Sequence, residues 1–500
     1  MKERILFWID IEFVYFGIAK SFNENYDCDI YAIIDVNEKA KHFFEEQKLI
    51  PFKKKWYYLD HVKNEFEPNL DYLKSFEKKY NIKLWNLIYS ERSFYKFNEY
   101  YKFSLNEILS IVEQECRFYE NILDEIKPDF VIIKMTDWHH NQLFYDLCKA
   151  KGIKILMTIP TRFGFRCLIS ENIDKMDELK EDVTCEIKHL GQYLDSFNSF
   201  KQATQFTKDY QKFNLHKLKS IIHFFLNPFD TKYMKRYSNR NKTKSKILRK
   251  YLSLIIKKKY REFFINKNFW HNISDEKFIF FPMHFEPERT LSTDAPFFTN
   301  QLEDITHIAK SIPIDFKLYV KEHPVMKTLG WRDISYYKKI LALPNVKLIH
   351  PSIKPEILYE NCSLVITTTG TAGLEATIHK KPTIVLSDVI YSEISSVYRL
   401  ESIEKLPHLI NKILDVKHDF KDVKRFVEIN HQESFEFDSN KLATDFSSTC
   451  YYGGFLTDLE LESKKVIDFL NNNEKILSRS ALHHIKKINE FKKIRKQMNR

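Results

Sequence analysis

The sequence has 500 residues, 43% of them hydrophobic, with a net charge of +11 and only 9 glycines and 15 prolines. Its length exceeds the ~250–300 residues that one hydrophobic core can serve, so at least two domains are expected, and the scarcity of glycine and proline excludes a collagen-like or low-complexity chain. No apolar run reaches the ~18–20 residues of a membrane-spanning helix, and the seven cysteines form no C-x-x-C pair, so we expect a reduced, cytoplasmic protein without disulfides or zinc.

The first third of the chain predicts alternating strands and helices. Short apolar runs, typical of buried strands, occupy 5–9, 30–36, 130–133 and 153–159. Helical spacing of apolar residues covers 16–22, 105–126 and the stretch from about Asn141. Asp10 and Glu12 follow the first run closely, so this run predicts an opening strand rather than a signal peptide. Strands separated by helices imply a parallel sheet, and we assign residues 1–170 to a first α/β domain.

The middle of the chain, 171–270, is polar and basic and predicts a mostly helical connection. Alternation resumes in a second α/β domain at 271–425. Its expected strands are 277–282, 316–320, 346–349, 363–367 and 382–386, and its expected helices are 298–311 and one from Ala372. Residues 426–500 predict a helical segment with a basic tail. The fold class is therefore α/β, with two parallel sheets and a cleft between them.

The positive charge is concentrated in two segments, 232–267 and 479–500. Such blocks suit an anionic partner, although a solvated helical face would carry the same residues. Aromatic residues do not interleave with the charges as a base-stacking surface requires, and no nucleic-acid motif occurs, so nucleic acid is not an expected partner. These segments predict peripheral association with the inner face of the cell membrane.

One chemical motif follows the expected strand 316–320. Lys321, Glu322, His323 and Pro324 come directly after its apolar residues. In open α/β sheets ligands bind beyond the carboxyl ends of the strands, where an imidazole can donate to a phosphate oxygen and a lysine adds positive charge. The alternative is a histidine whose hydrogen bonds are satisfied within a turn.

A second motif joins the strand 363–367 to a helix through a turn rich in hydroxyls and glycine. It contains Thr368, Thr369, Gly370 and Thr371. Such a turn directs main-chain N–H groups, hydroxyls and the positive end of the helix at an anion. Glu375, one turn into the helix, can accept hydrogen bonds from ribose hydroxyls or be a solvated helix residue. The turn lacks the G-x-G-x-x-G pattern of dinucleotide sites.

The third motif follows the strand 277–282 and holds His284, Glu286, Glu288 and Arg289. These side chains can bind a donor phosphate, orient a sugar or take a proton from an acceptor hydroxyl, so His284 and Glu286 are candidate catalytic residues. A salt-bridged loop without direct function is the alternative.

In chain order and in spacing, the loop with His284, the helix carrying N-Q-L, the loop with His323 and the threonine-rich turn resemble those of capsule-polysaccharide biosynthesis transferases, a group that includes the Kdo transferases. The H-P and threonine-rich elements also resemble those of bacterial sialyltransferases. The resemblance implies a GT-B fold of two Rossmann-like domains and a CMP-activated acidic sugar as donor. It further implies that His323, Thr368, Thr369 and Thr371 contact the CMP phosphate. The chain departs from the commoner capsule form at His284 and Glu286, where that form has Gln and Asp.

The resemblance assigns the acceptor, and with it a catalytic base, to the first domain. Three groups of polar residues follow strands there, and Asp10, Asp137 and His139 are the candidate bases. Arg162 and Arg166 can grip a sugar carboxylate or a phosphate. Helix capping and turn formation are the alternative roles for all of these residues. No ligand set extends beyond 137–140, so no metal and no cofactor are expected, with the CMP-sugar as a substrate.

The sequence thus predicts a glycosyltransferase that moves an acidic sugar, Kdo-like or nonulosonic, from a CMP-sugar to a capsule- or lipopolysaccharide-type glycan or glycolipid. A transferase of polyol phosphate from CDP-glycerol or CDP-ribitol is the nearest alternative. A UDP-sugar epimerase and a non-catalytic glycan- or lipid-binding scaffold of capsule assembly are the others.

Overall fold

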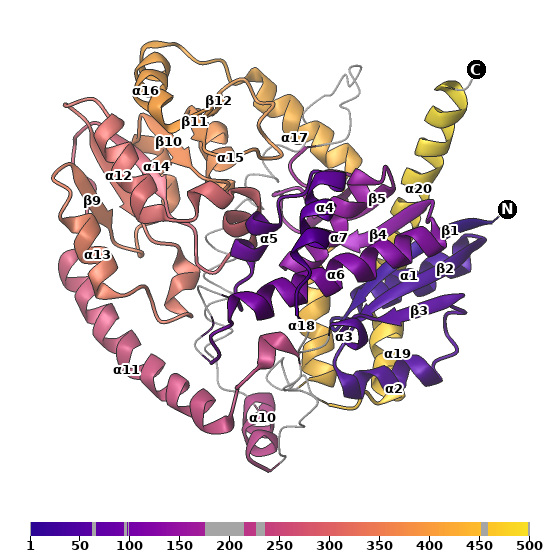
Figure 1. Cartoon of the computed structure of the whole chain (residues 1–500). Helices are drawn as coiled ribbons and strands as arrows, with labels where there is room; N and C mark the ends of the chain where they lie inside the picture. The colour runs from indigo at the N-terminus through magenta and orange to yellow at the C-terminus, as the bar shows by residue number, and fades with distance from the viewer. Residues whose placement is uncertain are drawn as a thin grey trace.

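The structure is a computed structural model that describes residues 2–62, 67–94, 98, 100–175, 215–226, 236–451 and 459–498. It contains two parallel-sheet units, one built mainly from the first 170 residues and one from residues 278 to 415 (Figure 1). Most of residues 176–235, within the predicted basic connection, lie outside the described part.

The first sheet has seven strands in the order β13-β6-β5-β4-β1-β2-β3. Its strands from the first third of the chain are β1 (Glu3–Asp10), β2 (Cys28–Asp35), β3 (Lys54–Tyr57), β4 (Phe130–Lys134), β5 (Lys154–Pro160) and β6 (Arg166–Ser170). The helices between them are α1 (Val14–Asn25), α2 (Glu38–Glu46), α3 (Tyr58–His61), α4 (Leu70–Tyr80), α5 (Leu84–Ser90), α6 (Leu105–Ile126) and α7 (His139–Ala150). Strands β1 to β5 are parallel, and β6 is antiparallel to β5. The predicted strands are confirmed, and α6 begins where Ser104 and Glu107 form a reciprocal capping box.

The second sheet has six parallel strands in the order β12-β11-β10-β7-β8-β9. They are β7 (Phe278–Pro282), β8 (Lys317–Lys321), β9 (Val346–Ile349), β10 (Leu364–Thr367), β11 (Thr383–Val385) and β12 (Val397–Arg399). Its helices are α12 (Gln301–Ser311), α13 (Ile334–Leu341), α14 (Pro355–Asn361), α15 (Thr371–Ile378) and α16 (Leu406–Asp415). Short helical turns occupy η3 (Thr290–Asp294), η4 (Pro296–Phe298), η5 (Pro324–Lys327) and η6 (Ile403–Lys405). The helix expected at 298–311 therefore begins later, at Gln301, because the turn η4 precedes it.

Counted within each unit, both sheets follow the order 3-2-1-4-5 of Rossmann-like folds, which reverses direction between the first and fourth strands. This reversal lies between β1 and β4 in the first sheet and between β7 and β10 in the second. The expected α/β fold with two Rossmann-like units is confirmed. Such reversal points are where ligands bind in open α/β sheets.

The chain returns to the first unit after the second is complete. The returning elements are α17 (Lys421–Glu433), β13 (Phe435–Glu436), α18 (Ser439–Cys450), α19 (Ser463–Asn472) and α20 (Glu474–Met498). Strand β13 pairs with β6, and α20 packs against α1. A Cβ atom on Gly17 would stand 2.7 Å from Leu477 and 3.0 Å from Leu470, so a larger residue there would push these side chains aside. The segment predicted as a separate helical tail thus completes the core of the first unit.

Two helices of the basic connection are described, α10 (Leu215–Leu226) and α11 (Lys244–Asn268), with the turn η2 (Tyr237–Asn239) between them. Helix α11 runs along the outside of the molecule toward the second unit (Figure 1). No helix within the described ranges is long and apolar enough to cross a membrane.

Candidate functional site

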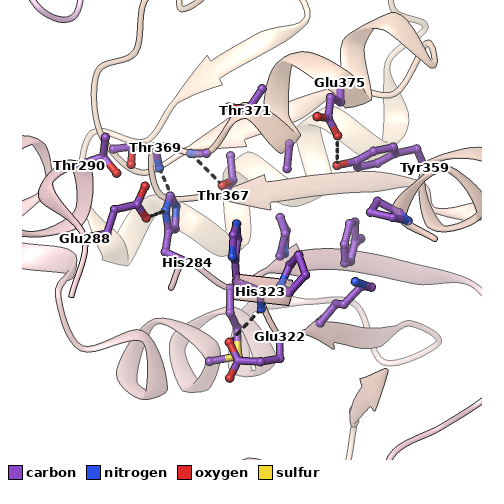
Figure 2. A pocket seen from close by; sticks show the side chains of 18 of the residues that line it. His284, Glu288, Thr290, Glu322, His323, Tyr359, Thr367, Thr369, Thr371 and Glu375 are labelled. Carbon is purple, nitrogen blue, oxygen red and sulfur yellow. Dashed lines mark hydrogen bonds and ion pairs between the residues drawn. The ribbon is translucent and has the colours of Figure 1, made fainter. Parts of the chain in front are cut away.

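A pocket lies at the carboxyl ends of β7, β8 and β10, at the reversal point of the second sheet (Figure 2). It is a small cavity of about 150 Å³ that opens to solvent. All three predicted motifs contribute to its wall. Its polar lining residues are Arg162, His284, Glu288, Thr290, Lys321, Glu322, His323, Tyr359, Thr367, Thr369, Thr371 and Glu375.

His323 presents a hydrogen-bond donor to this pocket. Its Nδ1 atom accepts the main-chain N–H of Val325 at 3.2 Å, so the ring proton of the neutral imidazole is on Nε2. Burial lowers the pKa of His323 to about 4, against the opposing influence of Glu288. The side chain is therefore neutral near pH 7 and acts as an N–H donor rather than as a cation.

His284 holds the threonine-rich turn in place. Its Nε2 atom accepts the main-chain N–H of Thr369 at 3.3 Å, and its Nδ1 atom lies 2.9 Å from Oε2 of Glu288. Because Nε2 is an acceptor, Nδ1 carries the proton and donates it to the Glu288 carboxylate. This chain of hydrogen bonds ties the loop after β7 to the loop after β10 (Figure 2).

The threonine-rich turn offers groups suited to an anion at the start of α15. The main-chain N–H of Gly370 donates to Oγ1 of Thr367 at 3.2 Å. The hydroxyl of Thr369 lines the pocket, is buried, and has no hydrogen-bond partner in the structure. A Cβ atom on Gly370 would stand 2.8 Å from Oγ1 of Thr367, so glycine keeps this turn tight. This hydroxyl is therefore free to form a hydrogen bond with a ligand in the pocket.

Other predicted residues complete the wall of the pocket. Burial lowers the pKa of Lys321 to about 8, so the ammonium is retained near pH 7 but lost in mild alkali. Pro324 begins the turn η5. Glu375 accepts a hydrogen bond from the hydroxyl of Tyr359 at 2.8 Å. The hydroxyl of Thr368 is buried and has no hydrogen-bond partner in the described part of the chain, but Thr368 does not line the pocket.

Arg332, which the sequence analysis missed, positions two of the motifs. Its guanidinium lies 2.9 Å from Glu322 and 3.0 Å from Glu286, and it donates to the main-chain oxygen of His284. Glu322 is fully buried and also accepts from the hydroxyl of Tyr337 at 2.8 Å. The carboxylates of Glu286 and Glu322 therefore support the loops from within.

Gln301, from the N-Q-L stretch at the start of α12, fastens the same loop. Its Oε1 atom accepts the main-chain N–H of His284 at 2.7 Å, and its Nε2 atom donates to Glu286 at 2.8 Å. Nothing in the spacing of these residues could have paired them, because the contacts join segments separated in sequence.

A cluster of charges marks the reversal point of the first sheet. The ammonium of Lys134, at the end of β4, lies 2.6 Å from Asp10, 3.2 Å from Asp137 and 3.7 Å from Glu12. Partial burial and the carboxylates of Asp10 and Asp137 raise the pKa of Glu12 to about 7, although Lys134 acts in the opposite direction. The side chain of Glu12 remains 43% exposed. Of the carboxylates in this cluster, Glu12 thus combines access to solvent with a pKa suited to proton transfer near pH 7.

The two reversal points face each other across the contact between the units. Arg289, in the loop after β7, donates to the main-chain oxygen of Thr136, in the loop after β4. It also pairs with Asp294 at 2.5 Å, so its role in the structure is to join the units rather than to line the pocket. A smaller pocket at this contact is lined by Met135 and Asp388, among others, and shares Arg162 and Thr369 with the main pocket.

Arg162 is the residue of the first unit that reaches the main pocket. Its φ angle is +70°, in the left-handed region that side chains other than glycine rarely adopt. Strained backbone of this kind often occurs where a side chain serves a function. No hydrogen bond or ion pair of its guanidinium occurs in the described part of the chain, so this cation is available to an anion.

Arg166 and His139 lie away from both pockets and from the cluster around Lys134. Arg166 donates to Ser434 at 2.8 Å and to the main-chain oxygen of His431 at 3.0 Å, and so attaches the returning chain to β6. His139 is buried between Glu91, at 2.6 Å, and Glu115, at 2.9 Å. Neither side chain reaches the pockets, because Arg166 points toward β13 and His139 points into the core.

In the described ranges, Glu115, His139 and His140 are the group whose ligand atoms lie close enough to hold a metal ion, within 4.8 Å of one another. Both ring nitrogens of His139 already contact carboxylates, and His140 lies 3.3 Å from Asp35. A metal would have to displace these ion pairs, so the cluster fits a buried network of charges better than a metal centre.

Residues 187–395 match the family model described as capsule polysaccharide biosynthesis protein. The match covers less than half of the chain but includes all three loops that form the main pocket. The resemblance of this chain to capsule polysaccharide biosynthesis proteins is therefore confirmed. No curated protein matches the sequence.

Three solved structures are among those that match this chain. The UDP-GlcNAc 2-epimerase from Methanocaldococcus jannaschii is 15% identical, with 86% of this chain and 99% of that chain covered and a TM-score of 0.24. The KpsC β-Kdo 2,7 transferase of Thermosulfurimonas dismutans is 10% identical, with 63% and 80% covered and a TM-score of 0.30. The N-terminal domain of Candida albicans trehalose-6-phosphate phosphatase is 11% identical, with 90% and 97% covered and a TM-score of 0.30. TM-scores this low support no inference about this chain.

Proposed function

We propose that this protein is a glycosyltransferase of surface-polysaccharide synthesis that uses a CMP-activated acidic sugar and works at the cytoplasmic face of the membrane. The observation that carries the proposal is the convergence of three donors on one pocket at the reversal point of the second sheet. They are the Nε2–H of His323, the unpartnered hydroxyl of Thr369 and the amino end of α15. Such groups bind the phosphate of a nucleotide.

Donor binding follows from these groups. His323 and Thr369 donate hydrogen bonds to the phosphate oxygens, and the dipole of α15 stabilises their charge. Arg162 stands between the two pockets and is suited to the carboxylate of an acidic sugar, which a guanidinium binds with two parallel hydrogen bonds. A neutral sugar would leave this arginine without a partner.

Transfer requires a base on the acceptor side, and Glu12 supplies it. The acceptor hydroxyl attacks the anomeric carbon, the bond from that carbon to the phosphate oxygen breaks, and CMP leaves with the bonding electrons. The hydroxyl proton passes to the Glu12 carboxylate. His323 and the start of α15 stabilise the charge that develops on the departing phosphate.

The same phosphate-binding groups would serve a CDP-polyol transferase, which is the nearest rival. The two activities differ in product, because a CMP-sugar transferase forms a glycosidic bond and the rival forms a phosphodiester. Mass spectrometry of the product, before and after mild acid and phosphodiesterase treatment, distinguishes them.

The first experiment is thermal unfolding with CMP, CDP, UDP, GDP and ADP. A ligand at ~100 times its dissociation constant stabilises by ~2.7 kcal/mol, which gives a measurable shift in midpoint. We expect the largest shift with CMP, and its loss in H323A. The control is H350A, since His350 follows the neighbouring strand β9 but does not line the pocket. A preference for CDP favours the polyol-phosphate rival and one for UDP favours an epimerase. No shift with any nucleotide favours the non-catalytic scaffold and refutes the proposal.

A further inference from the structure

Helix α11 exposes an apolar stripe on the side that faces away from the protein. Leu248, Leu252 and Ile256 repeat every four residues, and Tyr260 and Phe263 continue the stripe; these five side chains are 42%, 52%, 71%, 67% and 66% exposed. A monomeric soluble protein buries such a stripe, because exposed apolar residues normally occur singly. This face of α11 is therefore an interaction surface.

The opposite side of the helix is fixed to the second unit. Arg261 donates to the main-chain oxygens of Gly330 and Trp331, both at 3.0 Å, and Leu254 packs so closely on Gly330 that a Cβ atom there would stand 2.8 Å away. Ile265 is buried. The helix thus has a defined orientation, and the apolar stripe cannot rotate inward.

The charges around the stripe identify its partner. Helix α11 carries nine lysines and arginines and a single acidic residue, Glu262, which pairs with Lys327 of the second unit at 2.8 Å. Arg249, Lys257 and Lys259 have no ion pair within the described ranges. Apolar side chains bordered by lysines and arginines are typical of helices that lie in the surface of an anionic bilayer.

Helix α10 extends the surface. The ammonium of Lys244 donates to the main-chain oxygen of Phe225 at 3.2 Å, which places the end of α10 beside the start of α11. Leu215, Ile222 and Leu226 on α10 are 75%, 48% and 74% exposed. Helix α20, which carries most of the other basic segment, lies on the opposite side of the molecule from α10 and α11 in Figure 1. The apolar and basic interaction surface is therefore formed by α10 and α11, and the basic tail does not contribute to it.

We propose that the exposed face of α10 and α11 docks on an anionic phospholipid bilayer, with the apolar stripe in the headgroup region and the basic residues on the lipid phosphates. A second copy of this chain is a poorer occupant, because symmetric pairing would place these basic residues opposite one another. The proposal does not rest on the nucleotide site.

The test is co-sedimentation with vesicles of phosphatidylglycerol and phosphatidylcholine, and with vesicles of phosphatidylcholine alone, without nucleotide. We expect binding to the anionic vesicles only, weakened by salt. The variant L252E/I256E should bind at least about tenfold more weakly, since each side chain loses its apolar burial and gains a negative charge. K257Q/K259Q should lose about fivefold per lysine.

The matched control is Ile314→Glu, since Ile314 is a fully exposed isoleucine outside this surface. This variant should bind vesicles like the unaltered protein. All variants should have the same thermal midpoint as the unaltered protein. Equal binding by L252E/I256E and the unaltered protein, or no binding to anionic vesicles at low salt, overturns the proposal. So does a dimer in solution that L252E/I256E converts to a monomer. Because the vesicle assay contains no nucleotide, none of these results tests the proposed transferase activity, which is tested separately by nucleotide binding.

Discussion

Replacing Thr369 by valine tests two effects of its hydroxyl separately: its effect on the free energy of unfolding and its contribution to nucleotide binding. The Thr369 hydroxyl is buried and has no hydrogen-bond partner among the described residues, and the residue is 3% exposed. An unsatisfied buried polar group costs ~1–3 kcal/mol, and valine has nearly the same shape. We therefore expect T369V to leave the free energy of unfolding unchanged or to raise it by up to ~1 kcal/mol.

The same substitution should weaken nucleotide binding. A hydrogen bond to a charged group contributes ~1.5–3 kcal/mol, so the loss of one from the phosphate should raise the dissociation constant for CMP by about tenfold to a hundredfold. Denaturant unfolding measures the first effect and titration calorimetry the second. The main-chain N–H that Thr369 donates to His284 is unchanged by the substitution.

The comparison for the stability measurement is T367V, two residues earlier. Oγ1 of Thr367 accepts the N–H of Gly370 at the start of α15, so its loss should cost ~1 kcal/mol of stability. If T369V were as destabilising as T367V, or bound CMP like the unaltered protein, the assignment of the Thr369 hydroxyl to a ligand would be refuted.

Two further predictions concern titrating groups. Glu12 has a pKa near 7 and acts as a base only when ionised, so kcat should fall about tenfold per pH unit below pH 7. Above pH 7, E12Q should lose ~10²–10⁴-fold while CMP binding persists, and its kcat should no longer follow this pH dependence; an unchanged profile in E12Q would exclude Glu12 as the base. The carboxylates of Glu115 and Glu91 raise the pKa of His139 to about 10 despite its burial. Its contribution to stability is complete below pH ~6.5 and lost as pH rises through 10, so the thermal midpoint should decline over that range, less steeply in H139Q; parallel profiles would contradict this.

The sheets and the main pocket could be predicted from sequence because their signals are local. An apolar run followed directly by a polar motif identifies both a buried strand and what its carboxyl end carries, as at Tyr319–Pro324. The three motifs converge because parallel strands bring their carboxyl ends to one edge. This placement depends on strand order alone and needs no knowledge of side-chain packing.

Contacts between distant segments could not be predicted in this way. Arg332 and Gln301 hold the motifs through partners that are not near them in sequence. His139 and Asp137 both belong to the polar stretch after β4, yet one points into the core and the other joins the cluster around Lys134. The difference depends on which side of the first turn of α7 faces the sheet. The residue types alone do not predict this orientation.

The return of the chain to its first unit has a consequence for biosynthesis. Residues from Phe435 onward, including β13 and α20, fill the core around α1 and β1. A ribosome delivers the first 170 residues long before these partners, whereas domains usually fold in the order in which they emerge. In this protein the second unit has all its strands and can fold while the first still exposes the apolar face that α20 will cover. The first unit is therefore synthesised first but completes its hydrophobic core last.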